Sequence, residues 1–359
     1  MSDVDAAHRF LARLMGQLKQ RGRAPAGTLA ACALLASRLG HRPLAVSLVR
    51  LALRGETTAD HRAAWLLHRL VGECLPESPD RAEILARTRR EATVRLVEQY
   101  RRLTADGDVD PINGAGGVAM ALWDVADGST RHQFAPDVAR TATTIVHRPR
   151  NDVYHGRSGG ILLLRMLGAR YGLDPALTTA VDTVVGEYAT LDPATLDTGL
   201  LGVGGVTLCS GQPGMLTALG PDADPAVLAR IVGAPITRAS LHRLDGLLAD
   251  ENADIGFCHG LAGVGLGIRL APSWQDLVGP DRADRLTARL AGHLDRTDDA
   301  AVATVLAMPV VHSVLTGPLG VALALAETRA STPPWWAVGV SLGDGTSAVV
   351  QRRAIGVTA

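Results

Sequence analysis

The chain has 359 residues, which suits one large repeat domain or two ordinary ones, and its 36 basic residues balance 36 acidic ones. A net charge of zero provides no basic surface for a polyanion, so nucleic acid is not expected as a partner. Apolar residues make up 47% of the chain, enough for a substantial core, yet no run approaches the ~18 apolar residues that a membrane span requires.

The N-terminal segment, residues 1–105, begins with charges scattered through MSDVDAAHRFLARLMGQLKQ, which is unlike a signal peptide. Four cysteines are too sparse for a disulfide framework, so we expect a protein of the reducing cytoplasm. Ala, Leu and Arg recur at helical spacing, as in GTLAACALLASRLG, and predict about two helical hairpins here.

From residue 106 onward a short phrase recurs five times, and each copy has a Gly-x-x-Gly core followed by an apolar run. The copies read DPINGAGGVAMAL, YHGRSGGILLL, LCSGQPGMLTAL, FCHGLAGVGLGI and LTGPLGVALAL, with leading glycines at Gly114, Gly156, Gly211, Gly260 and Gly317. Successive leading glycines are 42 to 57 residues apart, a period that holds one helical hairpin. The pattern predicts an all-α stack or ring of hairpins.

The segments between the copies carry signals for further helices. Three of them begin with proline at a plausible first-turn position: Pro136, Pro175 and Pro225. The tail from Ser331 cannot be a regular helix through its Pro-Pro pair and is expected to seal the ring. No linker interrupts the chain, so we predict a single domain over 1–359, with degenerate first repeats in 1–105 and motif-bearing repeats in 106–340.

Two physical roles are expected for the leading glycines. They would allow positive φ in the turn, and their missing side chains would let inner helices crowd together. Each phrase would also start a helix, where unpaired N–H groups and the helix dipole favour anions such as a thiolate. In a closed ring, equivalent positions of the phrases would converge on one axis.

Cys258 and His259 directly precede a leading glycine, and Cys209 occupies the Cys258 slot in the preceding copy. Thiolate and imidazole are ligands that Zn²⁺ prefers, and three protein ligands leave a fourth position open, as in catalytic sites. The alternative for a lone Cys-His pair is a buried structural cysteine beside a hydrogen-bonded histidine. The shared slot favours a zinc site of Cys209, Cys258 and His259.

His155 precedes Gly156 as His259 precedes Gly260, so it should face the same axis. Its alternative role is a helix cap or a backbone hydrogen bond. Asp110 is either a helix N-cap near Pro111 or the group that orients a catalytic histidine. Cys32 and Cys74 lie outside the phrases and are assigned to packing.

The motifs Asp-x-x-x-Gly, His-Gly-x-x-Gly, Cys-x-Gly-x-Pro-Gly, Cys-His-Gly-x-x-Gly and Leu-x-Gly-x-x-Gly, in this order, resemble those of the lanthionine synthetase C-like (LanC-like) cyclases. The motifs begin at Asp110, His155, Cys209, Cys258 and Leu315, and the resemblance covers about residues 106 to 340. It implies an α/α toroid of about seven helical hairpins that holds zinc through Cys209, Cys258 and His259.

The resemblance also implies a reaction and partners. A cysteine thiolate of a dehydrated precursor peptide would add to dehydroalanine or dehydrobutyrine and form a thioether ring, with His155 as general acid and Asp110 in support. A dehydrating kinase or lyase is the implied partner protein. The sequence departs from the family at Leu208, Ser210 and Gly205, where tryptophan, tyrosine and arginine are typical.

Three alternatives follow from these departures and from the chemistry. The protein could add a small thiol such as glutathione to an unsaturated residue, or act as a weakened scaffold that binds leader peptide or a partner enzyme. A zinc-dependent prenyltransferase also activates a peptide thiol in an α-barrel, but it would lack one motif per repeat.

Overall fold

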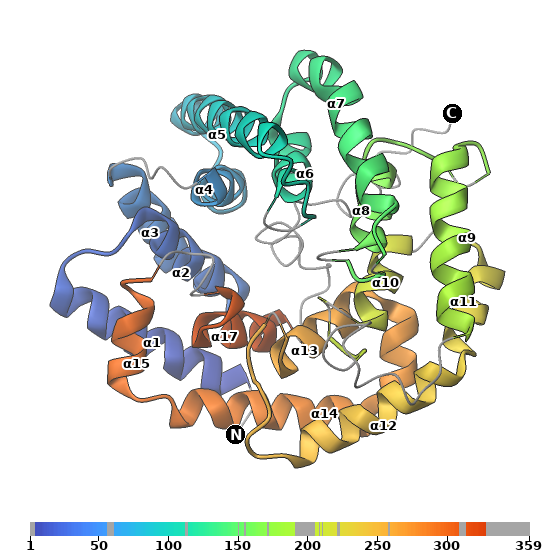
Figure 1. Ribbon diagram of the computed structural model, residues 1–359. Helices are drawn as coiled ribbons and strands as arrows, with labels where there is room; N and C mark the ends of the chain where they lie inside the picture. Colours follow the sequence, from blue (N-terminus) through green and yellow to red (C-terminus); the bar gives the residue numbers. More distant parts are fainter. Residues whose placement is uncertain are drawn as a thin grey trace. The chain divides into compact units, whose positions relative to one another are not determined.

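The computed structural model describes twelve stretches of the chain, and all helices reported below lie within them. They are residues 4–55, 61–111, 114–149, 151–153, 156–170, 172–190, 205–207, 209, 211–220, 223–257, 259–308 and 314–327. Across these stretches every regular element is a helix, and the sole bridge of β type joins Gly205 to Gly211 (Figure 1). The all-α prediction is therefore confirmed for the described residues.

The N-terminal part contains five helices. They are α1 (Val4–Arg21), α2 (Ala26–Arg38), α3 (Arg42–Arg54), α4 (His61–Cys74) and α5 (Pro79–Ala105). In α2 every residue from 27 to 36 is buried, whereas α3 buries one face only. A helix that is buried all round belongs to the interior of a protein. This part of the chain therefore supplies an inner helix although it lacks the glycine phrase.

Each glycine phrase begins a helix directly after its leading glycine, as predicted. We call these five the glycine-led helices: α6 (Ala115–Val125), α8 (Arg157–Met166), α10 (Gln212–Leu219), α13 (Leu261–Leu270) and α17 (Pro318–Glu327). All residues of α10 are buried, and residues 319–327 of α17 are buried as well. The glycine-led helices are thus inner helices, which their uniformly apolar sequences require.

Close backbone packing, and not positive φ, requires glycine at the leading positions. The expected role of these glycines in allowing positive φ is therefore wrong. Gly114, Gly156 and Gly211 are N-caps with φ of −97°, −131° and −128°. A methyl group added at Gly211 would lie 2.5 Å from the carbonyl carbon of Gly205, and one at Gly260 would lie 2.5 Å from the Asp254 carbonyl oxygen. The chain before each helix folds back against its glycine, which leaves no room for a side chain.

Replacing Gly211 by alanine is expected to destabilise the fold by about 2 kcal/mol, because the new methyl group would meet backbone atoms that cannot move independently. Gly186 provides the matched control, since it lies inside a helix with nothing within 4 Å of an added methyl group. Gly186→Ala should stabilise the fold by about 0.5–1 kcal/mol. Urea unfolding followed by circular dichroism measures both changes, and equal effects in the two variants would contradict the packing explanation.

The remaining helices connect the glycine-led helices. They are α7 (Gly128–Val146), α9 (Pro175–Thr190), α11 (Pro225–Val232), α12 (Pro235–Ala249), α14 (Pro272–Arg296) and α15 (Asp299–Val305). Pro175 and Pro225 begin helices as predicted, but Pro136 lies inside α7. Helix α7 begins earlier because the Asp127 side chain accepts a hydrogen bond from the Thr130 N–H, a stronger start signal than proline.

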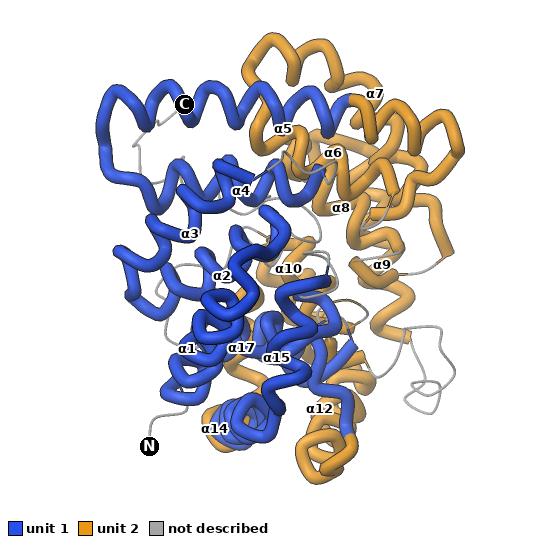
Figure 2. The backbone as a smooth tube through the Cα atoms, turned by 90° about the vertical axis from the view of Figure 1, so that its left-hand side faces the viewer, with its two compact units in different colours: residues 1–97, 253–266, 283–332 blue, residues 98–252, 267–282, 333–359 orange. Residues whose placement is uncertain are grey.

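The described chain divides into two compact units, each assembled from separate stretches of sequence (Figure 2). Unit 1 takes its described residues from 1–97, 253–266 and 283–332, and unit 2 takes its described residues from 98–252 and 267–282. In unit 1, α2 packs against α3, α4 and α17, while α1 packs against α15 and α17. In unit 2, α8 packs against α6, α7, α9 and α10.

A cluster of charged side chains connects three helices of unit 1. Arg38 at the end of α2 bonds Glu73 of α4 through both terminal nitrogens, at 2.7 and 3.1 Å. Its Nε lies 2.7 Å from Glu327 Oε1 at the end of α17, and Glu327 is only 1% exposed. Charge pairing therefore supports this junction between the first and last parts of the chain.

None of the described helices is both long enough and apolar enough to cross a membrane.

Candidate functional site

The loop before α6 places the predicted residue Asp110 against an arginine. Helix α6 is capped by Gly114, so Asp110 is not its N-cap, and the capping alternative is wrong. The Asp110 carboxylate instead lies 3.5 Å from Arg148 Nη1, and its side chain is 18% exposed. Its backbone carbonyl accepts the Gly114 N–H at 3.1 Å. Asp110 is thus a mostly buried carboxylate with a cation beside it.

Sequence reasoning missed Arg148. Its residue type could have drawn attention, because it belongs to the short basic run His147-Arg148-Pro149-Arg150 that follows α7. The contact with Asp110 joins residues 38 positions apart, which no local pattern indicates. The two side chains carry opposite charges and attract each other. Arg148 therefore belongs with Asp110 in the candidate site.

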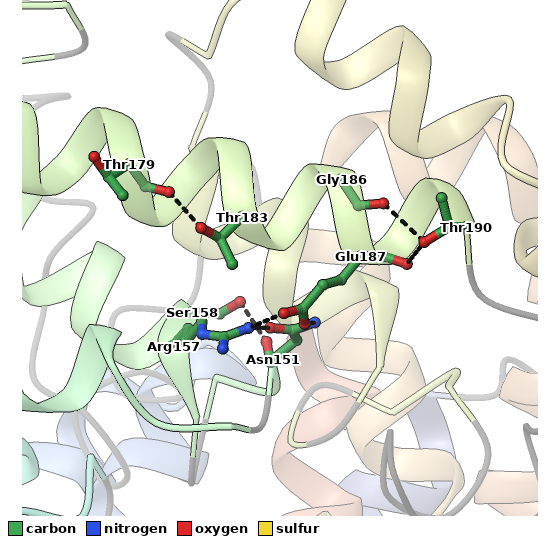
Figure 3. Close-up of polar contacts among 8 residues, drawn as sticks. All are labelled: Asn151, Arg157, Ser158, Thr179, Thr183, Gly186, Glu187 and Thr190. Atoms are coloured by element: carbon green, nitrogen blue, oxygen red, sulfur yellow. Dashed lines mark hydrogen bonds and ion pairs between the residues drawn. The ribbon is translucent and has the colours of Figure 1, made fainter.

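The loop before α8 carries His155, which lies outside the described residues together with Tyr154. Both flanks of the loop are described, and hydrogen bonds connect them. Ser158 Oγ donates to the Asn151 carbonyl oxygen at 2.5 Å, and Arg157 Nη1 donates to Asn151 Oδ1 at 3.0 Å (Figure 3). The two described flanks of this loop are therefore bonded to each other.

The loop before α10 carries Cys209, which is 1% exposed. Gln212 N–H donates to the Gly205 carbonyl at 3.0 Å, so the chain turns back tightly around the cysteine. Gly205 has a φ of 60°, in the left-handed region that favours glycine. This is the position where the family pattern has arginine. The backbone conformation of this loop thus favours glycine over a residue with a side chain.

The loop before α13 carries Cys258, which lies outside the described residues, and His259, which is exposed. Leu261 N–H donates to the Asp254 carbonyl at 2.9 Å, and Phe257 N–H donates to the Leu315 carbonyl at 3.1 Å. Leu315 belongs to the loop before α17, so the fourth and fifth phrases are neighbours within unit 1. The loop geometry matches that at Cys209, with the chain folded back onto the leading glycine.

Within each unit, successive phrases lie side by side. In unit 2 a methyl group on Gly159 of α8 would meet the Pro111 ring of the first phrase, and one on Gly267 of α13 would lie 2.5 Å from Pro213 of α10. Helix α8 also contacts both α6 and α10. These contacts bring the Asp110 loop to the start of the helix that follows His155, as the repeat predicts.

The chemistry of the predicted donors suits zinc, because two cysteine thiols and an imidazole are borderline-soft ligands. Cys209 lies three residues before the first residue of α10. Among the residues that are described, no three His, Cys, Asp or Glu side chains form a metal-binding group.

Comparison with solved structures finds the same fold in nisin cyclase. The similarity has a TM-score of 0.58 and covers 93% of this chain and 96% of that chain, with 13% sequence identity. No protein-family model matches the sequence, and no curated protein matches it. The chain therefore has the fold of a LanC-like cyclase, the all-α α/α toroid that the sequence motifs predict.

Proposed function

We propose that the protein is a zinc-dependent cyclase that closes a thioether ring in a dehydrated precursor peptide. The observation that carries this proposal is the combination of the nisin cyclase fold over 93% of the chain with cysteine and histidine in matching slots before glycine-led helices. Many activities share one fold, so the proposed reaction is argued from the chemistry of the candidate site residues. These are Cys209, Cys258, His259, His155 and Asp110.

Cys209, Cys258 and His259 would hold the zinc ion. A bound zinc ion would keep a thiol deprotonated near neutral pH while leaving it nucleophilic. In the substrate, a cysteine sulfur forms a bond to the β-carbon of dehydroalanine or dehydrobutyrine. The π electrons of that residue move toward its carbonyl and give an enolate, and the thiol proton has already left to solvent.

His155 would complete the reaction by donating a proton to the α-carbon of the enolate, which ends the reaction without net loss of atoms. A positioned general acid typically accelerates such a step by 10²–10⁴-fold. Asp110 would orient the histidine, and Arg148, whose Nη1 lies 3.5 Å from the Asp110 carboxylate, would hold that carboxylate in place. The substrate itself, a dehydrated peptide, is the partner that this chemistry requires.

Replacing His155 by alanine is expected to leave the zinc content unchanged and to lower thioether formation by roughly 10²-fold, since the enolate would then await a proton from water. The assay uses a peptide with one cysteine and one dehydroalanine, analysed by mass spectrometry after alkylation of unreacted thiol. His147 provides a control, because it is an exposed histidine at the end of α7.

His147→Ala should retain full activity and full zinc content. Undiminished ring formation by His155→Ala would remove His155 from the mechanism. If the wild-type protein closes no ring but joins free glutathione to the dehydroalanine, small-thiol addition replaces the cyclase proposal. If it does neither and yet binds an unmodified leader peptide, the scaffold role replaces both.

A further inference from the structure

Three polar side chains form a closed triangle at the base of the His155 loop (Figure 3). Asn151 Nδ2 donates to Glu187 Oε2 at 2.7 Å, Arg157 Nη1 donates to Asn151 Oδ1 at 3.0 Å, and the same nitrogen donates to Glu187 Oε1 at 2.6 Å. Ser158 Oγ adds a fourth bond to the Asn151 carbonyl. We call Asn151, Arg157, Ser158 and Glu187 the loop clamp.

Two members of the loop clamp are shielded from solvent. Asn151 is 7% exposed and the Arg157 side chain 14% exposed, whereas the Glu187 side chain is 45% exposed. Both ends of the Asn151 amide have partners, which a buried amide requires. Hydrogen bonds between charged groups are stronger than neutral ones, and networks in low dielectric reinforce one another. The cluster therefore holds its members in one arrangement more firmly than an exposed ion pair would.

Glu187 anchors the loop clamp to a rigid element. It lies on α9, whose other face is packed into the core through Val184, Val185 and Tyr188. The clamp ties residues 151 and 157, on either side of His155, to this helix. Packing of α8 against α9 already joins the two helices, so the clamp is not needed to hold them together. Its distinct effect is to join the two described flanks of the loop to one point on α9.

We propose that the loop clamp is the positioning unit of His155 and that Arg157 is its central residue. This inference rests on the proposed function of His155 as general acid. Proton transfer demands placement within hydrogen-bond reach of the reacting carbon, and a displacement of about 1 Å can cost 10²-fold in rate. Arg157 occupies a variable position of the His-Gly-x-x-Gly motif, so the clamp is a feature of this chain's own sequence.

The test replaces Arg157 by alanine and uses Arg282→Ala as the matched control. Arg282 makes a comparable pair with Asp245, at 2.8 and 2.9 Å, and joins α14 to α12 without touching a glycine phrase. Arg157→Ala should lower kcat for the dehydroalanine peptide about tenfold and leave KM and zinc content unchanged. Arg282→Ala should lower thermal stability to a similar degree and leave kcat unchanged.

A double variant separates positioning from general destabilisation. If Arg157 acts through Glu187, then Arg157→Ala combined with Glu187→Ala should lower kcat no further than either change alone. Unchanged kcat in Arg157→Ala, or an equal loss in Arg282→Ala, would overturn the inference. Additive losses in the double variant would also overturn it.

A measurement without turnover keeps the inference distinct from the proposed function. Acylation of His155 by diethyl pyrocarbonate, followed by peptide mass spectrometry, reports the surroundings of its ring. The rate should change at least threefold in Arg157→Ala and not in Arg282→Ala. An inactive wild-type protein that shows this change would refute the cyclase proposal and support the clamp, whereas an unchanged rate would refute the clamp.

Discussion

Replacing Cys209 by alanine is expected to remove the bound zinc almost completely and to abolish thioether formation, while the helical fold persists. A site with three protein ligands loses most of its affinity for zinc when one thiolate is removed. The binding free energy of a zinc site is of order 10 kcal/mol, and here only three ligands would contribute to it. The fold should persist because the glycine-led helices are buried by apolar contacts. Metal analysis and circular dichroism measure the two quantities.

Cys32 provides the matched control for this prediction. It is completely buried in α2, outside the glycine phrases, and burial raises the pKa of its thiol to about 12, which favours the protonated form near neutral pH. Cys32→Ala should therefore retain one zinc ion per chain. A Cys209→Ala/Cys258→Ala double variant that still carries stoichiometric zinc would exclude the proposed ligand set.

Replacing Arg38 by alanine is expected to lower the free energy of unfolding by about 3 kcal/mol. The change would leave the Glu327 carboxylate, which is 1% exposed, without the guanidinium 2.7 Å away, and removing one partner of a buried ion pair typically costs 3–5 kcal/mol. The Arg38 side chain is 17% exposed and the Glu73 side chain 27% exposed, so we expect a loss of unfolding free energy at the lower limit of that range. Urea unfolding gives the measurement.

Arg9 is the control for Arg38, because it pairs with Asp295 in the same unit but with both side chains more than 40% exposed. Exposed ion pairs contribute at most about 1 kcal/mol, so Arg9→Ala should change stability little. The two variants remove the same side chain and differ mainly in burial. Equal losses in the two would show that the Arg38 cluster has no special role in stability.

The sequence was informative where a pattern repeats and uninformative where single side chains meet across the fold. Five equivalent phrases predicted five buried helices, and the order of Asp110, His155, Cys209 and Cys258 predicted the toroid fold. The reason for the glycines was partly wrong, because φ angles and backbone approach at Gly211 cannot be read from residue type. Strong periodicity identifies helices, but it does not specify loop geometry.

The partners of the candidate site residues were the main omission. Arg148 meets Asp110 across 38 residues, and Asn151 meets Glu187 across 36. Such contacts depend on how outer helices pack beside inner ones, and no local signal encodes them. Gly205 shows the reverse case, because a departure from the family pattern was visible in the sequence while the left-handed backbone there, which favours glycine, required the structure.

The long-range contacts of α1 and α2 have a consequence for synthesis of the protein. Thr28 Oγ1 bonds the Met308 carbonyl, 280 residues later, and Arg13 bonds the Leu294 carbonyl across 281 residues. At translation rates of about 5–20 residues per second, α2 leaves the ribosome roughly 15–60 s before these partners exist. During that interval α2, which is buried on every side in the folded protein, has α1, α3 and α4 as available neighbours but not α17. Nascent chains of this protein are thus expected to expose apolar surface of α2, which favours aggregation, until almost the whole chain has been made.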